Sequence, residues 1–276
     1  MNNASIIEQI QSFLEEDIGS GDVTAEIIPE NKIAEAEVVT REAMVLCGQA
    51  CFDAVFRLLD ENVHIEWLVD EGGRVGKDTV LCRLRGRARG LLTGERTALN
   101  ILQTLSATAT QARRYADAVA GTNCRVLDTR KTLPGLRKLQ KYAVACGGCS
   151  NHRIGLFDAV LIKENHIIAA GSIAAAVQRA RAQSDVPIEV EVENLQEFEE
   201  AHAAAPDRIM LDNFSLEDLQ TVVQRNAGRI ELEASGNIDL HTVRKIAETG
   251  VDFVSVGALT KNIDAIDLSM RIGLVD

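Results

Sequence analysis

The stretch PIEVEVENLQEFEEAHAAAPDRIMLDN, residues 187–213, sets the fold of the second half of the chain. It begins and ends with short apolar runs, at 187–193 and 208–213, and the segment between them is long enough for a helix. A strand, a helix and a second strand in succession predict two parallel strands of one sheet.

The same alternation extends to both sides of this stretch. Further apolar runs lie at 125–131, 157–165, 230–235 and 251–257, and most of the intervals between them can hold a helix. Six such units without a dinucleotide glycine fingerprint favour a parallel barrel or a partly open barrel. An open doubly wound sheet is the competing topology.

The earlier part of the chain has a different pattern. Apolar residues at helical spacing predict helices at 5–17 and 95–120, and the second of these bridges into the alternating region. Strand patterns at 34–40, 64–69 and 79–84 surround a helical patch at 51–59. The predicted fold class is therefore α/β, with a small N-terminal domain preceding an open barrel of about six parallel strands.

Composition is that of a soluble globular protein. Of the 276 residues, 46% are apolar and 25% charged, and no apolar run approaches the roughly 20 residues that span a bilayer. The start, 1–16, lacks the basic and apolar regions of a signal peptide, so a cytoplasmic location with six reduced cysteines is predicted. The net charge of −12 argues against nucleic acid as a partner.

Positive charge is nevertheless concentrated in one region. Residues 125–165 contain eight Lys or Arg and three acidic residues, a net charge of +5 in a chain that is otherwise acidic. Such an island indicates either a focused site for a small polyanion or an ordinary solvated basic surface. Charge alone leaves both interpretations open.

Polar residues follow each of the six predicted strands. Parallel strands bring their carboxyl ends to one edge, where loops converge on a single mouth, so these residues are predicted to form a site. In chain order they are Asp128, Arg130 and Lys131; Lys163 to His166; Glu191 and Glu193; Asp212 and Asn213; Glu233, Ser235 and Gly236; and Ser255 and Gly257.

The residue types divide this predicted site into two halves. The first two strand ends supply cations, of which Arg suits carboxylates and Lys suits phosphate. Glu193 and Asp212 supply oxygen ligands for ribose hydroxyls or for magnesium, which would stabilise a departing pyrophosphate. The turns at 235–237 and 257–258 can offer backbone N–H groups to a phosphate.

Several ordered motifs resemble the quinolinate phosphoribosyltransferases. The resemblance runs through nearly the whole chain, and motifs of this number and length are specific. They are Glu95 to Asn100, Thr129 to Thr132, Pro134 to Arg137, Gly147-Gly148 with Asn151 to Arg153, Leu161 to His166, Glu189 to Glu193, Ile209 to Asn213 and Glu233 to Ile238.

This resemblance implies an organisation and an activity. Residues 1–107, joined by the C-terminal tail, would form an α/β sandwich domain, and residues 108–276 an open α/β barrel. The reaction would join quinolinate to phosphoribosyl pyrophosphate with loss of carbon dioxide, giving nicotinate mononucleotide in NAD biosynthesis. The protein would be a homodimer whose active site is completed by the neighbouring subunit, with Mg2+ as cofactor.

The resemblance also assigns roles to residues. Arg130, His152, Arg153 and Lys163 would grip quinolinate, with Arg96 reaching in from the partner subunit, and Lys131 would serve the pyrophosphate. Catalytic roles are predicted for Lys131, Lys163, Glu193 and Asp212, the last two also at the metal. The remaining predicted substrate-binding residues are Thr129, Ser235, Gly236, Asn237, Val256, Gly257 and Ala258. Leu133 and Asn237 depart from the family pattern, which more often has Thr and Gly there.

Parts of the same pattern also fit other functions. Lys163 at a barrel strand end could be the Schiff-base lysine of an aldolase, but an aldolase has little use for so many additional cations. A divergent member of the same superfamily could use nicotinate or another anionic acceptor. A barrel that only binds an anionic metabolite would show tight binding without turnover.

Overall fold

The computed structural model describes residues 3–275, which divide into two compact units. The first unit comprises the described residues up to Gln111 together with those from Ile263 onward, and the second comprises Ala112–Asn262. Helix α3 (Ala88–Ala118) runs from the first unit into the second, so the predicted boundary between residues 107 and 108 falls inside a helix.

The first unit is built on a four-stranded antiparallel sheet in the order β12-β1-β5-β3. Strand β12, formed by residues near the C-terminus, pairs with β1 along its length, from Ala34 opposite Leu274 to Thr40 opposite Leu268. Besides α3, the elements of this unit are α1 (Asn3–Ile18), a 3-10 turn (Ala25–Ile27), β1 (Ile33–Thr40), β2 (Met44–Val45), α2 (Gln49–Leu59), β3 (His64–Trp67), β4 (Arg74–Val75), β5 (Val80–Arg87) and β12 (Leu268–Leu274).

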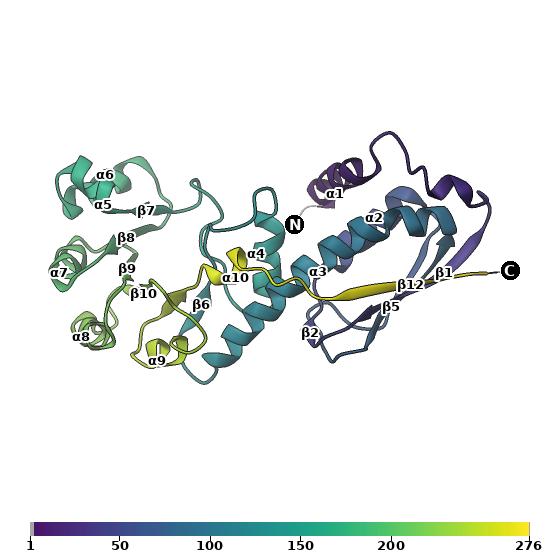
Figure 1. Ribbon diagram of the computed structural model, residues 1–276. Helices are drawn as coiled ribbons and strands as arrows, with labels where there is room; N and C mark the ends of the chain where they lie inside the picture. Colours follow the sequence, from purple (N-terminus) through teal and green to yellow (C-terminus); the bar gives the residue numbers. More distant parts are fainter. Residues whose placement is uncertain (1–2, 276) are drawn as a thin grey trace. The chain divides into compact units, whose positions relative to one another are not determined.

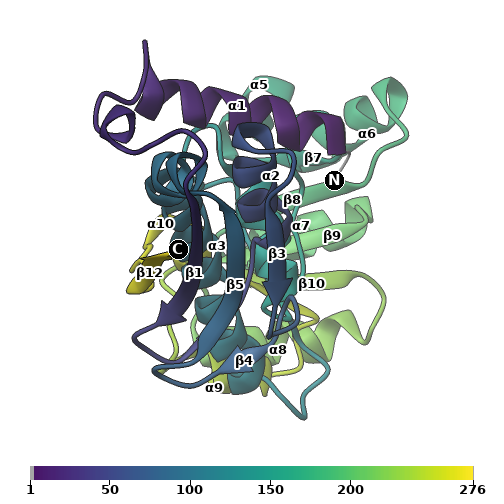
Figure 2. The same cartoon turned by 90° about the vertical axis from the view of Figure 1, so that its right-hand side faces the viewer.

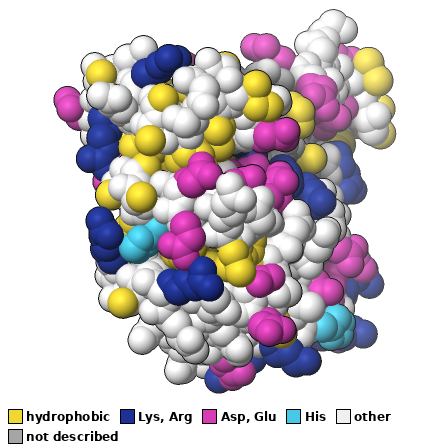
Figure 3. Space-filling view, turned by 90° about the vertical axis from the view of Figure 1, so that its left-hand side faces the viewer, with side chains coloured by type: hydrophobic (Ala, Val, Ile, Leu, Met, Phe, Trp, Pro, Cys, Tyr) yellow, Lys and Arg dark blue, Asp and Glu magenta, His cyan; other side chains and the backbone are white. Residues whose placement is uncertain are grey.

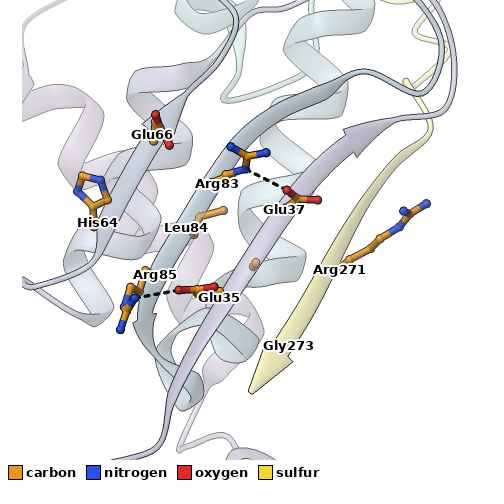
Figure 4. Close-up of a pocket in the computed structure, with 10 residues that line it drawn as sticks. Glu35, Glu37, His64, Glu66, Arg83, Leu84, Arg85, Arg271 and Gly273 are labelled. Carbon is orange, nitrogen blue, oxygen red and sulfur yellow. Dashed lines mark hydrogen bonds and ion pairs between the residues drawn. The ribbon is translucent and has the colours of Figure 1, made fainter. Parts of the chain in front are cut away.

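One face of this sheet is charged. Figure 2 shows β1, β5 and β3 side by side, and Figure 4 shows a shallow hollow on their surface. Cross-strand ion pairs join Arg83 to Glu37 at 3.0 Å and Arg85 to Glu35 at 2.9 Å. All four side chains are more than two-fifths exposed, so these ion pairs contribute little to the stability of the fold. Their charges make this face of the sheet hydrophilic.

The second unit contains a six-stranded parallel sheet in the order β6-β11-β10-β9-β8-β7. Strands β6 and β7 are its two edges, which is the arrangement of an open barrel. Its elements after α3 are β6 (Arg125–Leu127), α4 (Arg137–Cys146), β7 (Val160–Ile162), α5 (Glu164–Ala170), α6 (Ile173–Gln183), β8 (Ile188–Val192), α7 (Leu195–Ala204), β9 (Arg208–Asp212), α8 (Leu216–Asn226), β10 (Glu231–Ser235), α9 (Val243–Ala247), β11 (Phe253–Ser255) and α10 (Ala258–Lys261).

Local sequence explains where the outer helices begin. The side-chain oxygens of Ser172, Asn194 and Ser215 accept the backbone N–H of the third following residue, at 2.9–3.1 Å. These N-caps start α6, α7 and α8 directly after the preceding strands or turns. Figure 1 shows these helices along one side of the sheet.

Alternation along the strands separates an apolar face from a polar one. In β8, Ile188, Val190 and Val192 belong to the core that packs against the helices. Glu189 and Glu191, between them, point to the other face, because successive side chains of a strand alternate. The same parity holds in β9 and β10, where Leu211 and Ala234 lie in the core. The inner face of the open barrel is therefore polar.

The predicted fold class is confirmed: a small α/β unit precedes a six-stranded parallel sheet with helices. All six predicted strands form, but each is shorter than its apolar run, which extends beyond the strand at one or both ends. The six cysteines are free thiols, as predicted. Along the described residues, no helix combines the length and apolar character needed to cross a membrane. Figure 3, viewed from the side of α6, α7 and α8, shows acidic and basic side chains interspersed.

Candidate active site

A cavity of about 300 Å³ lies at the carboxyl ends of the parallel strands, within the second unit. Its lining is mostly polar and comes from both edge strands and from the four strands between them. The lining residues are Thr129, Arg130, Lys131, His152, Arg153, Leu161, Lys163, Glu191, Met210, Asp212, Glu233, Ser235 and Ser255. The strand-end prediction is thus realised as one shared hollow.

Loops hold the cations on one side of this cavity. The Thr129 hydroxyl accepts the backbone N–H of Lys131 at 3.1 Å, and Arg137 donates to the backbone oxygen of Arg130 at 3.4 Å. On the neighbouring segment, the Arg153 guanidinium donates to the backbone oxygen of Ala159 at 3.1 Å. Burial, together with the positive charge of Arg130, lowers the pKa of Arg153. An anion between these two cations would relieve their repulsion.

Strands hold the carboxylates on the other side. Glu191 lies within β8, and Asp212 is the last residue of β9. Lys163, directly after β7, forms an ion pair with Glu191. Asp212 accepts a hydrogen bond from the side-chain amide of Asn213 at 2.7 Å. Positive and negative groups therefore share one cavity, as the division into two halves predicted.

A buried polar cluster lies against the cavity on the inner face of the sheet. His152 Nε2 is 2.9 Å from Glu189 and 3.5 Å from Glu233, and Arg208 donates to Glu233 at 3.2 Å. The Glu233 side chain is completely buried. Burial, reinforced by the negative charge of Glu189, raises the pKa of Glu233 to about 7.

The proton arrangement of this cluster follows from its contacts. The backbone N–H of Arg153 donates to His152 Nδ1 at 2.8 Å, so the ring proton belongs on Nε2, facing the carboxylates. Burial lowers the pKa of His152 while Glu189 and Glu233 raise it more strongly, but the N–H at Nδ1 opposes a second ring proton. We therefore assign the exchangeable proton to the carboxyl of Glu233. A metal on Nε2 is disfavoured too, because Nδ1 would then need a proton where it meets a donor.

Comparison with known proteins gives the same picture along the whole chain. Residues 22–106 match the family model of the quinolinate phosphoribosyl transferase N-terminal domain, and residues 108–271 match that of the C-terminal domain. The chain belongs to the quinolinate phosphoribosyltransferase family. A probable nicotinate-nucleotide pyrophosphorylase (carboxylating) from Synechocystis is 44% identical over 95% of this chain and 91% of its own.

Further members of the quinolinate phosphoribosyltransferase family are similarly close. A probable nicotinate-nucleotide pyrophosphorylase (carboxylating) from Bacillus subtilis is 40% identical, covering 99% of this chain and 96% of its own. The solved structure of nicotinate-nucleotide pyrophosphorylase from Francisella tularensis has a TM-score of 0.96 at 47% identity, with 99% of this chain and 98% of that chain covered. The predicted family resemblance is confirmed.

Most of the predicted substrate-binding side chains line the cavity of this family member. These are Thr129, Arg130, Lys131, His152, Arg153, Lys163, Asp212 and Ser235. Glu193 is placed differently, since it lies beyond the last residue of β8 and lines an adjacent acidic hollow. Glu191, which was predicted as a strand-end site residue without a substrate or metal role, lines both hollows. Strand parity favours such a role, because Glu191 shares its face with the buried Glu189.

The predicted phosphate turns follow β10 and β11. Gly236 has φ +101°, and a Cβ there would come within 2.2 Å of the Asn213 side-chain oxygen, so only glycine fits. Asn237, where the family more often has Gly, adopts φ +49°, a left-handed conformation that Asn tolerates. Gly257 approaches the side chain of Lys131. Val256 and Ala258 flank it, on the turn between β11 and α10.

Arg96 lies deeper in its helix than the sequence pattern predicts. The pattern starts a helix at residue 95, which would place the Arg96 cation at the partly positive helix N-terminus, where a bound anion would be favoured. Helix α3 begins at Ala88, so Arg96 lies two turns inside it, and the dipole argument does not apply. Arg96 is exposed and belongs to the first unit, whereas the cavity belongs to the second. Its predicted role depends on the family resemblance alone.

Proposed function

We propose that this chain transfers the phosphoribosyl group of phosphoribosyl pyrophosphate to quinolinate in the cavity of the second unit. Pyrophosphate and carbon dioxide leave, and nicotinate mononucleotide is formed. The observation that carries this proposal is the joint lining of one hollow by loop cations and strand carboxylates. The relatives' name, nicotinate-nucleotide pyrophosphorylase (carboxylating), describes the same reaction read in reverse.

The cationic side suits the two adjacent carboxylates of quinolinate. Arg130 and Arg153 lie on separate loops and line the cavity together, and Lys163 lies at the neighbouring strand end. Guanidinium groups form paired hydrogen bonds with carboxylates, so two of them can orient a planar dicarboxylate. His152 also lines the cavity, where its Nδ1 accepts the backbone N–H of Arg153 and its Nε2 lies 2.9 Å from Glu189.

The first step requires charge stabilisation rather than a protein nucleophile. The lone pair of the quinolinate nitrogen forms a bond to the anomeric carbon, and the bond from that carbon to pyrophosphate breaks. Positive charge develops on the sugar, and the carboxylates of Glu191 and Asp212 lie on the cavity side suited to stabilise it. Lys131, near the Gly257 turn, would hold the pyrophosphate.

Decarboxylation follows from the charge created in the first step. The ring nitrogen is now cationic, so the bond from its neighbouring carbon to the carboxylate can break with the electron pair remaining on the ring. Carbon dioxide departs as this bond breaks, and the ring carbon then takes a proton from water. Fixed cations that hold the other carboxylate, such as Arg153 and Lys163, would keep the ring in place during this step.

The donor set of the acidic side fits magnesium. Glu191 and Asp212 offer carboxylate oxygens from neighbouring strands, with Glu193 in the adjoining hollow, and magnesium prefers such ligands. When bound, the ion would neutralise charge on the departing pyrophosphate. Asp212 and Glu193 were predicted as its ligands, and we add Glu191 to that proposal.

We further propose a homodimer in which Arg96 of one subunit completes the cavity of the other. This arrangement would place an additional cation beside Arg130 and Arg153. The free cysteines suit a reducing compartment, and we propose the cytoplasm as the location.

The test is an end-point assay of the purified protein with phosphoribosyl pyrophosphate and magnesium. Quinolinate and nicotinate are offered in parallel, and mononucleotide and carbon dioxide are detected. Product and carbon dioxide from quinolinate alone are expected. Turnover of nicotinate alone would favour the divergent superfamily member, and binding of quinolinate without turnover would favour a binding protein.

A further inference from the structure

Helix α4 presents two consecutive buried polar residues to the loops of the cavity. Gln140 is completely buried and Lys141 is 3% exposed. Neither side chain lines the cavity, although both lie directly behind its cationic loops. A buried lysine requires a specific reason, since taking its charge out of water is costly.

Lys141 and Asp128 together hold both polar backbone atoms of His152. Lys141 forms an ion pair with Asp128 and donates to the backbone oxygen of His152 at 2.9 Å. Asp128 accepts the backbone N–H of His152 at 2.9 Å and the side-chain amide of Asn151 at 2.6 Å. The peptide groups on either side of His152 are thereby fixed to one buried ion pair.

This ion pair joins the two segments that carry the cavity's arginines. Asp128 directly follows β6 and lies two residues before Arg130, and His152 directly precedes Arg153. A parallel bridge between Leu127 and Ser150 brings the two segments side by side. The positive charges of Arg130 and Arg153 repel each other, so the segments must be held together before a ligand arrives.

Stability alone does not account for the pair. Replacing a buried ion pair by apolar residues of similar size is often neutral or stabilising, whereas removing one partner is strongly destabilising. A buried ion pair can also fix the separation of two guanidinium groups. That separation affects catalysis rather than stability, because a displacement of about 1 Å can lower a reaction rate about 100-fold.

We propose that Lys141 and Asp128 are positioning residues, which set the separation of Arg130 and Arg153 to that of the two adjacent carboxylates of quinolinate. This inference rests on the proposed function. It assigns recognition of the dicarboxylate to a pair of residues that the substrate never touches. Gln140 has a parallel place on the pyrophosphate side, where it accepts the backbone N–H of Leu133 at 2.8 Å.

The test is the double variant Asp128→Asn with Lys141→Met, in which both charges are removed and side-chain size is kept. Because no unpaired charge remains buried, the variant is expected to fold, with an unfolding midpoint lowered modestly by the loss of the donor to the backbone oxygen of His152. KM for quinolinate should rise about 10- to 100-fold. KM for phosphoribosyl pyrophosphate should change less than about twofold, since the carboxylate side keeps its backbone ladder.

Asn226→Leu is the matched control. Asn226 is also buried and bonded to backbone, donating to the oxygen of Ile230 at 2.8 Å, but it precedes β10, at the end of the sheet away from the cavity. It should lower stability and leave both KM values unchanged. A double variant with the wild-type KM for quinolinate would overturn the positioning role, as would equal rises in both KM values.

Calorimetric titration of quinolinate separates this inference from the function on which it rests. Wild-type protein that neither binds nor converts quinolinate would remove the proposed function and the inference with it. Wild-type protein that converts quinolinate, beside a double variant with the same Kd for it, would leave the function standing and overturn the positioning role alone. The expected result is conversion by the wild type and a Kd raised about 10- to 100-fold in the variant.

Discussion

The carboxylates and the cations of the cavity are held by different kinds of structure. Glu191 and Asp212 lie on β8 and β9, where paired strands fix the backbone on both sides. Arg130 and Arg153 lie beyond the strand ends and depend on side-chain hydrogen bonds from α4 and from neighbouring loops.

This difference predicts how each half responds to change. The strand-borne carboxylates should withstand substitutions in the loops, because their positions follow from sheet register. The loop-borne cations should be sensitive to residues that do not contact substrate, because a few buried polar groups determine their positions. Four substitution experiments probe the contrast, beginning with the cations themselves.

Arg153→Met should produce the largest effect. Loss of a partly buried cation that pairs with a carboxylate should lower kcat/KM for quinolinate by about 100- to 1000-fold, or about 3–4 kcal/mol. KM for phosphoribosyl pyrophosphate should stay near the wild-type value. Steady-state kinetics with each substrate varied in turn measures both quantities. A loss confined to phosphoribosyl pyrophosphate would reverse the assignment of the two halves.

Val190→Ala tests whether the strand-borne carboxylates depend on the core packing beneath β8. Val190 is completely buried on the helix-packed face of β8, between Glu189 and Glu191. Its truncation should lower the free energy of unfolding by about 2 kcal/mol, measured with urea. Both KM values should remain close to wild type, since the ladder with β9 still fixes Glu191. A selective rise in KM for quinolinate would show that the ladder does not isolate the site from the core.

The sequence predicted the strand-borne half well. In the run 187–193, apolar and charged residues alternate, and this pattern gives both the strand and the face of each side chain, whereas the run 208–213 indicates a strand only by its apolar centre. Strand parity does not extend to Glu193, because the ladder ends at Val192. Glu191, inside the ladder, lines the cavity, and Glu193 lines the adjacent hollow.

The loop-borne half could be predicted only in its residue types. Charge concentration and family motifs indicated Arg130, Arg153 and Lys163, but not what holds them. The contact of Lys141 with Asp128 spans 13 residues and depends on the angle at which α4 packs, which no periodicity encodes. The surroundings of the His152 ring could not be predicted either, because the proximity of Arg153 and Glu189 to its nitrogens arises only in three dimensions.

Glu233→Gln tests the buried cluster behind the cavity. The pKa of Glu233 is raised from 4.5 to about 7, so the folded state binds a proton more tightly than the unfolded state. This contribution to stability is fully present below about pH 4.5 and is lost as pH rises toward 7. Wild-type stability should therefore decline across that window through this group.

The variant has no proton to lose at this position, so its decline should be shallower. We expect a difference on the order of 1–2 kcal/mol between the two pH profiles at neutral pH. Urea unfolding at several pH values measures it. Parallel profiles for wild type and variant would place the exchangeable proton elsewhere, on His152.

Mixing inactive variants tests a third source of charge, Arg96, which lies on a helix rather than on a loop or strand. Arg96→Ala and Lys163→Met are expected to be inactive separately. If Arg96 serves the partner subunit's cavity, each mixed dimer contains one intact cavity, formed by Lys163 of one chain and Arg96 of the other. Random exchange makes half of the dimers mixed, so about a quarter of wild-type activity should return.

Lys163→Met mixed with Arg153→Met is the matched control. Both residues line the cavity of the same unit, so a mixed dimer has one altered side chain in each cavity and no activity should return. No recovery in the Arg96 mixture, with subunit exchange verified by native mass spectrometry, would show that Arg96 acts within its own chain or outside the site. Recovery of activity in the Arg96 mixture would add a third way of positioning a charged group to the contrast between loops and strands. One cation would then be held in place by the interface between subunits.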